Sequence, residues 1–365
     1  MKFLRRTLLG IVGLVLIGWL ALSVYAYWPA TAEQPVASLV QPDDRFIEVN
    51  GLRLRYREYG TAAPGHRDLL LIHGFANSLQ SFRLLAPQLA ACCHVIAIDM
   101  PGYGLSSKPV QHDYHNGPQA AVMVAAANAL GLRQPIFVGH SLGGAVALQA
   151  VVKDPTAAGL VLMNPGILTT GVPKIVQITV PPLPRLSARL FGNRDFRERF
   201  LKTSYMDPAL VTPQVIYDVM LSARAEGYMA GMTSLMQQYA EGEEIALAPR
   251  VKVPTLIAWG DRDRNKALSE ADDLQRLVAG AQLVHFASAG HYVHEEAAEG
   301  VARAIEAWLR QLPPLAAACY DGSQEQWGMP ACAPKKVVAV KMSKTSVDSL
   351  PGAVAAVSVL ASAVR

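Results

Sequence analysis

Short apolar runs alternate with helix-length segments along most of this 365-residue chain, and this rhythm restricts the possible folds more than any other feature. The runs are typical of buried strands and occupy residues 69–72, 95–98, 136–138, 160–163, 255–259 and 282–286. Helical patterns separate or follow them at residues 79–91, 119–130, 142–152, 268–278 and 297–312. Strands joined through helices need crossover connections, so we expect an α/β fold with a mostly parallel central sheet and helices on both faces.

Two further patterns complete the expected organisation. Apolar and polar residues alternate on both sides of Asn50-Gly51, which predicts a hairpin at one edge of the sheet. Later the strand–helix rhythm stops, and a segment rich in proline and methionine carries helical patterns at residues 210–221 and 230–239. We therefore expect an α/β core at residues 46–164 and 251–312, a helical cap at residues 165–250 and a C-terminal tail at residues 313–365.

The first residues predict a membrane segment. Lys2, Arg5 and Arg6 precede an uncharged apolar stretch at residues 7–27, which is long enough to cross a bilayer as a helix. The basic flank favours the cytoplasmic side, so we expect residues 1–29 to be a retained anchor, with the rest of the chain on the non-cytoplasmic side (periplasmic in a bacterium). A cleaved signal peptide and a secreted product are the alternative. A polar linker is expected at residues 30–45.

Composition and cysteine usage restrict the partners. The net charge of +4 and the lack of a basic arm argue against a nucleic-acid partner. Cys319 and Cys332 flank a turn-rich stretch and would suit a small disulfide loop in an oxidising compartment. Cys92 and Cys93 precede a strand and are expected to be small buried residues, and neither pair has the spacing of a zinc site.

A serine stands at a sharp corner between a predicted strand and a predicted helix. The segment Gly139-His140-Ser141-Leu142-Gly143 fits the pattern G-x-S-x-G, in which a strained turn exposes the serine as a nucleophile. Glycine is needed on both sides because side chains there would clash. The backbone N–H of Leu142, directly after the serine, would donate to an oxyanion.

A serine nucleophile needs a base to accept its proton and a carboxylate to orient that base. On a parallel sheet such groups gather at the carboxyl ends of the strands. Asp261 and Asp263 follow the strand that ends at residue 259, and His291 follows the next strand. The chain order Ser, Asp, His is the order expected for this arrangement, while the choice between the two aspartates stays open.

Several other polar residues are expected to be structural. His140, His294 and Asp99 are assigned to packing, and the segment at residues 112–115, with sequence HDYH, is assigned to a solvated loop rather than to a metal site. The cap methionines are expected to pack in the core or to line an adaptable apolar pocket; they are Met220, Met229, Met232 and Met236.

Residues from about 46 to 312 resemble an α/β-hydrolase with a helical cap. The resemblance rests on five motifs: HGF at 73–75, DMPGYGLSSKP at 99–109, GHSLGG at 139–144, WGDRD at 259–263 and AGHYVHEE at 289–296. It implies Ser141 as nucleophile and His291 as base. Because the family acid usually lies three residues after the glycine, it implies Asp263, and the family's second oxyanion donor corresponds to Phe75.

Two positions depart from the family pattern. Ala267 stands where the family often has proline, and Asn164 occupies the place where some relatives carry the acid.

The resemblance implies a serine hydrolase that cleaves carboxylic esters through an acyl-enzyme, with no metal and no cofactor. Small-molecule ester or lipid-like substrates are expected, and the apolar composition of the cap favours an apolar acyl group. Carbon–carbon bond hydrolases, thioesterases and cofactor-free perhydrolases keep the same triad and remain alternatives. The rival from another class is a membrane-tethered binding protein on an inactive hydrolase fold.

Overall fold

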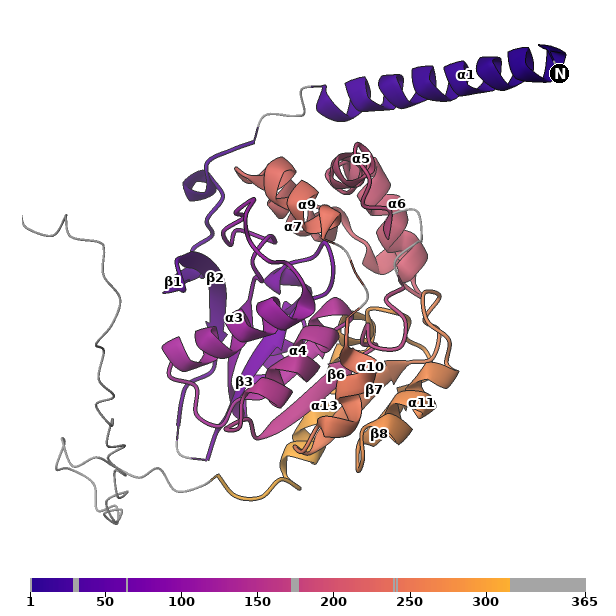
Figure 1. Cartoon of the computed structure of the whole chain (residues 1–365). Helices are drawn as coiled ribbons and strands as arrows, with labels where there is room; N and C mark the ends of the chain where they lie inside the picture. The colour runs from indigo at the N-terminus through magenta and orange to yellow at the C-terminus, as the bar shows by residue number, and fades with distance from the viewer. Residues whose placement is uncertain are drawn as a thin grey trace, which may run out of the picture. The chain divides into compact units, whose positions relative to one another are not determined.

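The computed structural model describes residues 2–28, 33–63, 65–171, 177–238, 240 and 242–315 (Figure 1). The expected Cys319–Cys332 disulfide lies outside the described residues, as does the rest of the tail after residue 315.

Eight strands form one sheet in the order β1-β2-β4-β3-β5-β6-β7-β8. β1 pairs antiparallel with β2, β2 pairs antiparallel with β4, and the remaining pairs are parallel. The predicted mostly parallel sheet, with the hairpin at its edge, is confirmed. The strands are β1 (Arg45–Val49), β2 (Leu52–Tyr59), β3 (Arg67–Ile72), β4 (Cys93–Ile98), β5 (Ile136–His140), β6 (Gly159–Met163), β7 (Thr255–Gly260) and β8 (Gln282–Phe286).

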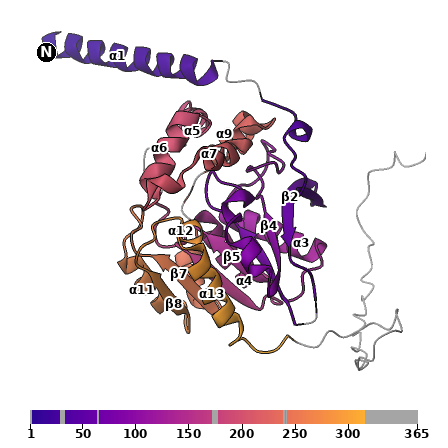
Figure 2. The same cartoon turned by 180° about the vertical axis from the view of Figure 1, so that it is seen from behind.

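Helices cover both faces of the sheet because alternate strand side chains point to opposite faces. In β3, Leu70 and Ile72 pack into one apolar cluster with α3 and α4, whereas Leu69 and Leu71 pack into a second cluster with α2 and α13. Figures 1 and 2 show these two layers from opposite sides. The helices of the core are α2 (Ala86–Leu89), α3 (Asn116–Ala129), α4 (Leu142–Lys153), α11 (Ser269–Leu277), α12 (Val293–Glu296) and α13 (Ala298–Leu309).

The prediction of a continuous helix over residues 79–91 is wrong. A 3₁₀ turn, η2 (Leu79–Phe82), and the separate helix α2 occupy this segment instead. Pro87 lies in the first turn of α2, where its missing N–H is tolerated, but it prevents a helix from continuing through this point. The helix predicted over residues 210–221 is also shorter, because Thr212 caps α7 (Pro213–Val219) and Pro213 begins it.

Between β6 and β7 the described residues form helices and turns but no strand. Met232 and Met236 of the cap are buried in the main apolar cluster, which agrees with the packing interpretation. The helices of this segment are α5 (Leu183–Phe191), α6 (Arg194–Ser204), α7, α8 (Leu221–Arg224), α9 (Tyr228–Gln237) and α10 (Glu244–Leu247).

The segment expected as a polar linker is fixed against the cap. The Glu33 carboxylate accepts hydrogen bonds from the backbone N–H groups of Gly227 (2.7 Å) and Met229 (2.8 Å). Gln34 forms a parallel bridge with Ala225. These contacts hold Glu33 and Gln34, which precede the first strand, against the helical segment between β6 and β7.

The helix α1 (Lys2–Tyr27) includes the predicted apolar segment. Its stretch from Phe3 to Tyr27 contains an 18-residue window with a mean hydropathy of 2.4 and is long and apolar enough to cross a membrane. No residue of that window is buried, whereas Ala26 near the end of the helix is buried.

A buried ion-pair network joins the hairpin to the loops at the carboxyl end of the sheet. The Asp99 carboxylate accepts hydrogen bonds from the backbone N–H groups of Leu79 (2.7 Å) and Leu105 (2.9 Å) and lies 3.3 Å from Nη1 of Arg55. Arg55 also pairs with Asp44 at 2.8 Å. Asp99 is therefore a structural residue that holds three segments together.

We expect Asp99→Asn to lower the free energy of unfolding by about 3–5 kcal/mol, because it leaves the buried Arg55 with one of its two counter-charges removed. Urea unfolding followed by circular dichroism measures this loss. Asp273→Asn is the control, since Asp273 forms an exposed pair with Arg276 and should change the free energy by less than about 1 kcal/mol. Equal losses in the two variants would contradict the structural role of Asp99.

Candidate active site

Ser141 lies at the turn between β5 and α4 in a conformation that residues other than glycine rarely adopt. Its φ is 50° and its ψ is −120°. A Cβ atom at Gly143 would lie 2.1 Å from the backbone oxygen of Ile72, and one at Gly139 would lie 2.2 Å from the backbone oxygen of Gly143. The two glycines therefore allow the close backbone approach that the turn requires.

The Ser141 side chain meets His291, which follows β8. Nε2 of His291 lies 3.1 Å from Oγ of Ser141, and Nδ1 of His291 lies 2.7 Å from Oδ2 of Asp263. Only 1% of the Asp263 side chain and 9% of the His291 side chain are exposed. The structure thus brings together three groups that are far apart in the sequence, in a row largely shielded from water.

The two aspartates that follow β7 have different partners. Asp261 pairs with Nδ1 of His285 at 2.7 Å, and that pair is partly exposed at the surface. Asp263 faces His291 instead. The resemblance and the geometry therefore select the same aspartate, whereas spacing from the strand end had left both possible.

Sequence reasoning missed the role of Asn164 beside this row. Nδ2 of Asn164 donates to Oδ2 of Asp263 at 2.9 Å, and its Oδ1 accepts from the backbone N–H of Gly260 at 2.9 Å. The amide therefore ties the end of β6 to the loop that carries Asp263. Its position directly after a strand was the available signal, but only a carboxylate was expected to contribute from this position.

The electrostatics of the site favour a charged Asp263. Burial by itself raises the pKa of Asp263, but the hydrogen bond and charge of His291, with N–H donors from Asn265 and Asn164, outweigh burial and lower that pKa. Burial also lowers the pKa values of His140 and His294 well below the usual range, and the neighbouring cationic groups lower them further. These two imidazoles therefore stay neutral and do not oppose a positive charge on His291.

His140 also positions His291. Its Nε2 donates to the backbone oxygen of His291 at 2.9 Å, and the backbone N–H of His291 donates to the oxygen of Ser204 at 3.3 Å. The loop that carries the imidazole is thus held on both sides by backbone contacts.

Two backbone N–H groups adjoin the serine. Leu142 begins α4, and Phe75 follows Gly74, where a Cβ atom would lie 3.1 Å from Cβ of Ser141. Within the described part of the chain, neither N–H donates to a protein acceptor. Free donors at a helix N-terminus and in an adjacent turn are suited to bind developing negative charge.

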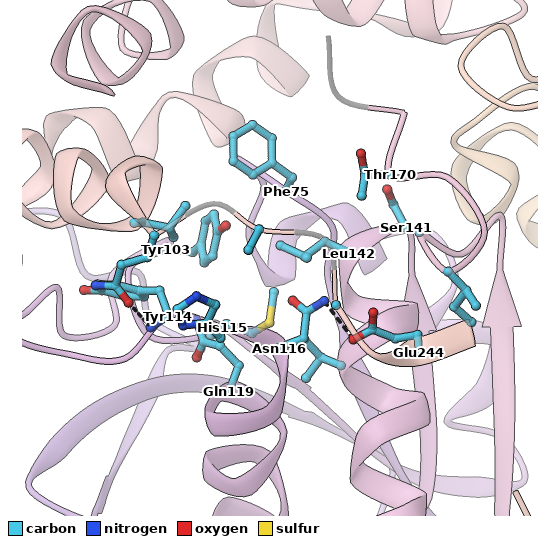
Figure 3. A pocket seen from close by; sticks show the side chains of 18 of the residues that line it. Phe75, Tyr103, Tyr114, His115, Asn116, Gln119, Ser141, Leu142, Thr170 and Glu244 are labelled. Atoms are coloured by element: carbon cyan, nitrogen blue, oxygen red, sulfur yellow. Dashed lines mark hydrogen bonds between the residues drawn. The ribbon is translucent and has the colours of Figure 1, made fainter. Parts of the chain in front are cut away.

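Two cavities meet at Ser141 and share Phe75 and Thr170. The larger encloses about 970 Å³, including its open mouth, and extends below the cap toward Glu244 (Figure 3). The smaller lies beneath Phe191 and Phe200 and reaches His291.

The larger cavity corrects one expectation. In the segment assigned to a solvated loop, Asp113 and His115 are exposed and pair with each other, but Tyr114 is buried and lines the cavity. No group of three or more metal-binding side chains occurs among the residues that the structure describes.

Comparison with known proteins identifies the family. Residues 69–298, more than half of the chain, match the family described as alpha/beta hydrolase fold. The chain therefore belongs to the α/β hydrolase fold family.

Three proteins illustrate this similarity. The uncharacterized hydrolase YugF of Bacillus subtilis is 26% identical over 74% of this chain and 99% of its own length. Lipase 1 of Psychrobacter immobilis is 29% identical over 69% of this chain and 79% of its own. The crystal structure of a membrane phospholipase A, described as a bacterial virulence factor, has a TM-score of 0.61 and 24% identity, covering 84% of this chain and 99% of that one.

The lowered pKa of Asp263 predicts a pH-dependent contribution to stability. The carboxylate stabilises the fold above its unfolded-state pKa of about 3.9, and this stabilisation is lost as the pH falls through the lower folded-state pKa. We expect the stability advantage of the wild type over Asp263→Asn to shrink between about pH 5 and about pH 2. Denaturant unfolding at several pH values measures it.

Asp261→Asn is the matched control for this measurement. Because the Asp261–His285 pair is partly exposed, its loss should change the free energy of unfolding by less than about 1 kcal/mol. An advantage over Asp263→Asn that stays constant across the acidic range would contradict the prediction.

Proposed function

We propose that this chain is a serine hydrolase that cleaves carboxylic esters through an acyl-enzyme. The observation that carries the proposal is the hydrogen-bonded row in which His291 lies 3.1 Å from Oγ of Ser141 and 2.7 Å from the carboxylate of Asp263. Ser141 is the nucleophile, His291 the general base and Asp263 the residue that orients the imidazole. The strained backbone of Ser141 supports this role, because such strain is typical of an exposed nucleophile.

The first half of the reaction forms the acyl-enzyme. Oγ of Ser141 attacks the ester carbonyl while its proton moves to Nε2 of His291. Asp263 stabilises the resulting imidazolium, and the N–H groups of Phe75 and Leu142 bind the oxyanion. His291 then gives its proton to the leaving alcohol as the tetrahedral intermediate collapses.

The second half releases the acid. A water molecule enters, loses its proton to Nε2 of His291 and attacks the acyl carbonyl. The proton returns to Oγ of Ser141 as the carbon–oxygen bond to the enzyme breaks. Every step uses only protein groups and water.

We propose an ester or lipid-like substrate with an apolar part. Two cavities lead away from Ser141, so one can hold the acyl group and the other the alcohol. The larger cavity has apolar walls that include Leu142, Val146 and Ile167. Similarity to a protein named as a lipase supports this substrate class.

We further propose that residues 1–29 are a retained anchor that keeps the domain on the non-cytoplasmic side of a membrane. The cap contacts the C-terminal end of this helix. Nε of Arg185 donates to the oxygen of Ala26 at 3.0 Å, and Nη1 of Arg189 donates to the oxygen of Trp28 at 2.6 Å. A cap held at the end of the anchor would lie near the lipid surface, from which apolar substrates would enter.

A serine-directed fluorophosphonate tests the chemistry. We expect the probe to label Ser141 and to stop hydrolysis of p-nitrophenyl esters, and Ser141→Ala to lower kcat by at least about 10³-fold. Peptide mass spectrometry locates the label. Absence of labelling in a folded sample would reject the proposal and favour a binding protein.

Paired variants and a second substrate class sharpen this test. Asp263→Asn should lower kcat by about 10⁴-fold, while Asp261→Asn should leave it nearly unchanged. Thioesters and vinylogous diketones, assayed beside the esters, separate ester cleavage from thioester and carbon–carbon bond cleavage.

If residues 1–29 are a retained anchor, the protein should be bound to the membrane and keep its full length. We expect alkaline carbonate to leave the protein in the membrane pellet, and the intact mass of the extracted protein to equal 39.2 kDa without further modification. Deletion of residues 2–28 should move it to the soluble fraction, because the only spanning candidate among the described residues is then gone. A lower mass, matching a protein whose N-terminus lies near residue 27 or 33, would indicate a cleaved signal peptide instead.

A further inference from the structure

A buried carboxylate lines the larger cavity. Glu244, the first residue of α10, is 2% exposed and lines the same cavity as Ser141. Its Oε1 accepts hydrogen bonds from Nδ2 of Asn116 in α3 at 2.9 Å and from Nε2 of Gln149 in α4 at 2.6 Å. Figure 3 shows Glu244 bonded to Asn116 on the opposite side of the cavity from Phe75. The proposed reaction does not use this group.

The carboxylate has no cationic partner. Among the described residues, no Lys, Arg or His lies within ion-pair distance of Glu244, and its Oε2 has no hydrogen-bond partner. Both amide donors bind the other oxygen. A charged group withdrawn from water is costly unless it is paired, so this arrangement favours a cation supplied by a ligand.

A glycine keeps space open beside the unpaired oxygen. A Cβ atom at Gly242 would lie 2.0 Å from Oε2 of Glu244, so a side chain at this position would displace the carboxylate. Gly242 also lines the cavity.

The cavity walls suit an apolar chain with a cationic end. Leu142 and Val146 give an apolar surface next to Ser141, and Tyr103 and Tyr114 add aromatic rings to the lining. The Glu244 carboxylate supplies the negative charge that an ammonium group would pair with.

We propose that Glu244, held by Asn116 and Gln149, binds an ammonium group, so that the preferred ester carries a cationic end on an apolar body. The assignment of this ligand as a substrate rests on the proposed ester hydrolysis, but the ammonium site itself does not. If Glu244 were only a structural clamp between α10 and the core, cationic and neutral ligands of equal length would bind alike.

Calorimetric titration of the full-length protein in a neutral detergent tests the site. The probes are n-hexylammonium and 1-hexanol, which match in chain length but differ in charge. We expect hexylammonium to bind at least about tenfold more tightly than hexanol to the wild type, because it forms a charge-assisted hydrogen bond with Glu244. Equal affinities of the wild-type protein for hexylammonium and hexanol would by themselves overturn the proposal.

Variants then assign the preference to this carboxylate. Glu244→Gln should remove the tenfold advantage of hexylammonium, and Gly242→Ala should reduce it by displacing Oε2. Glu243→Gln is the matched control, because Glu243 is the exposed neighbour in the sequence and should keep the full preference. Retention of the preference in Glu244→Gln would also overturn the proposal.

The same titration on Ser141→Ala separates this inference from the proposed function. That variant cannot form an acyl-enzyme, yet its ammonium site is intact, so the preference for hexylammonium should persist. A protein that binds hexylammonium selectively but is not labelled by the fluorophosphonate would refute the hydrolase proposal alone. A labelled protein without the preference would refute the ammonium site alone.

Discussion

The close approach of the backbone around Ser141 is the constraint on which the rest of the site depends. With glycine at position 143, the first turn of α4 lies directly against the end of β3, next to the backbone oxygen of Ile72. This contact brings the N-terminus of α4 beside the turn at Gly74 and Phe75, so Ser141 lies next to the backbone N–H groups of Phe75 and Leu142. Any side chain at position 143 would push the helix away and separate these groups.

The polar row beside the serine is assembled from several strand ends. Asp263 follows β7, His291 follows β8, and Asn164 follows β6 and ties the aspartate loop in place. Burial would normally favour a neutral carboxyl, but the converging donors keep the pKa of Asp263 low. The same burial lowers the pKa values of His140 and His294, so that the surrounding imidazoles are neutral. The negative charge of Asp263 thus lies beside His291, where it would stabilise an imidazolium, and His140 and His294 add no positive charge.

The helical segment between β6 and β7 lines the larger cavity at Ser141 and contacts the apolar helix α1. Its first described helix, α5, contacts the end of α1 through Arg185 and Arg189, whereas its last helix, α10, places Glu244 in the larger cavity. This insertion therefore contacts both the proposed anchor and the larger cavity. An apolar ligand with one cationic end would place its chain along the apolar walls of the cavity and its charge at the Glu244 carboxylate.

The sequence by itself determined the features that depend on local patterns: the strands, the parallel sheet with its edge hairpin, the apolar N-terminal helix and the glycine-flanked turn at Ser141. It overestimated the helix over residues 79–91, because the apolar pattern continued past Pro87 while the proline interrupted the backbone. Spacing from the strand end could not distinguish Asp261 from Asp263, because both follow β7 closely. The path of the loop after β7 directs Asp261 to His285 and Asp263 to His291. The family resemblance indicated Asp263, and the tertiary structure places that residue against His291. Tertiary structure alone revealed the clamp by Asn164 and the position of Glu244. Each depends on contacts between residues that are about 95 to 130 positions apart, and local preferences carry no information about such pairs.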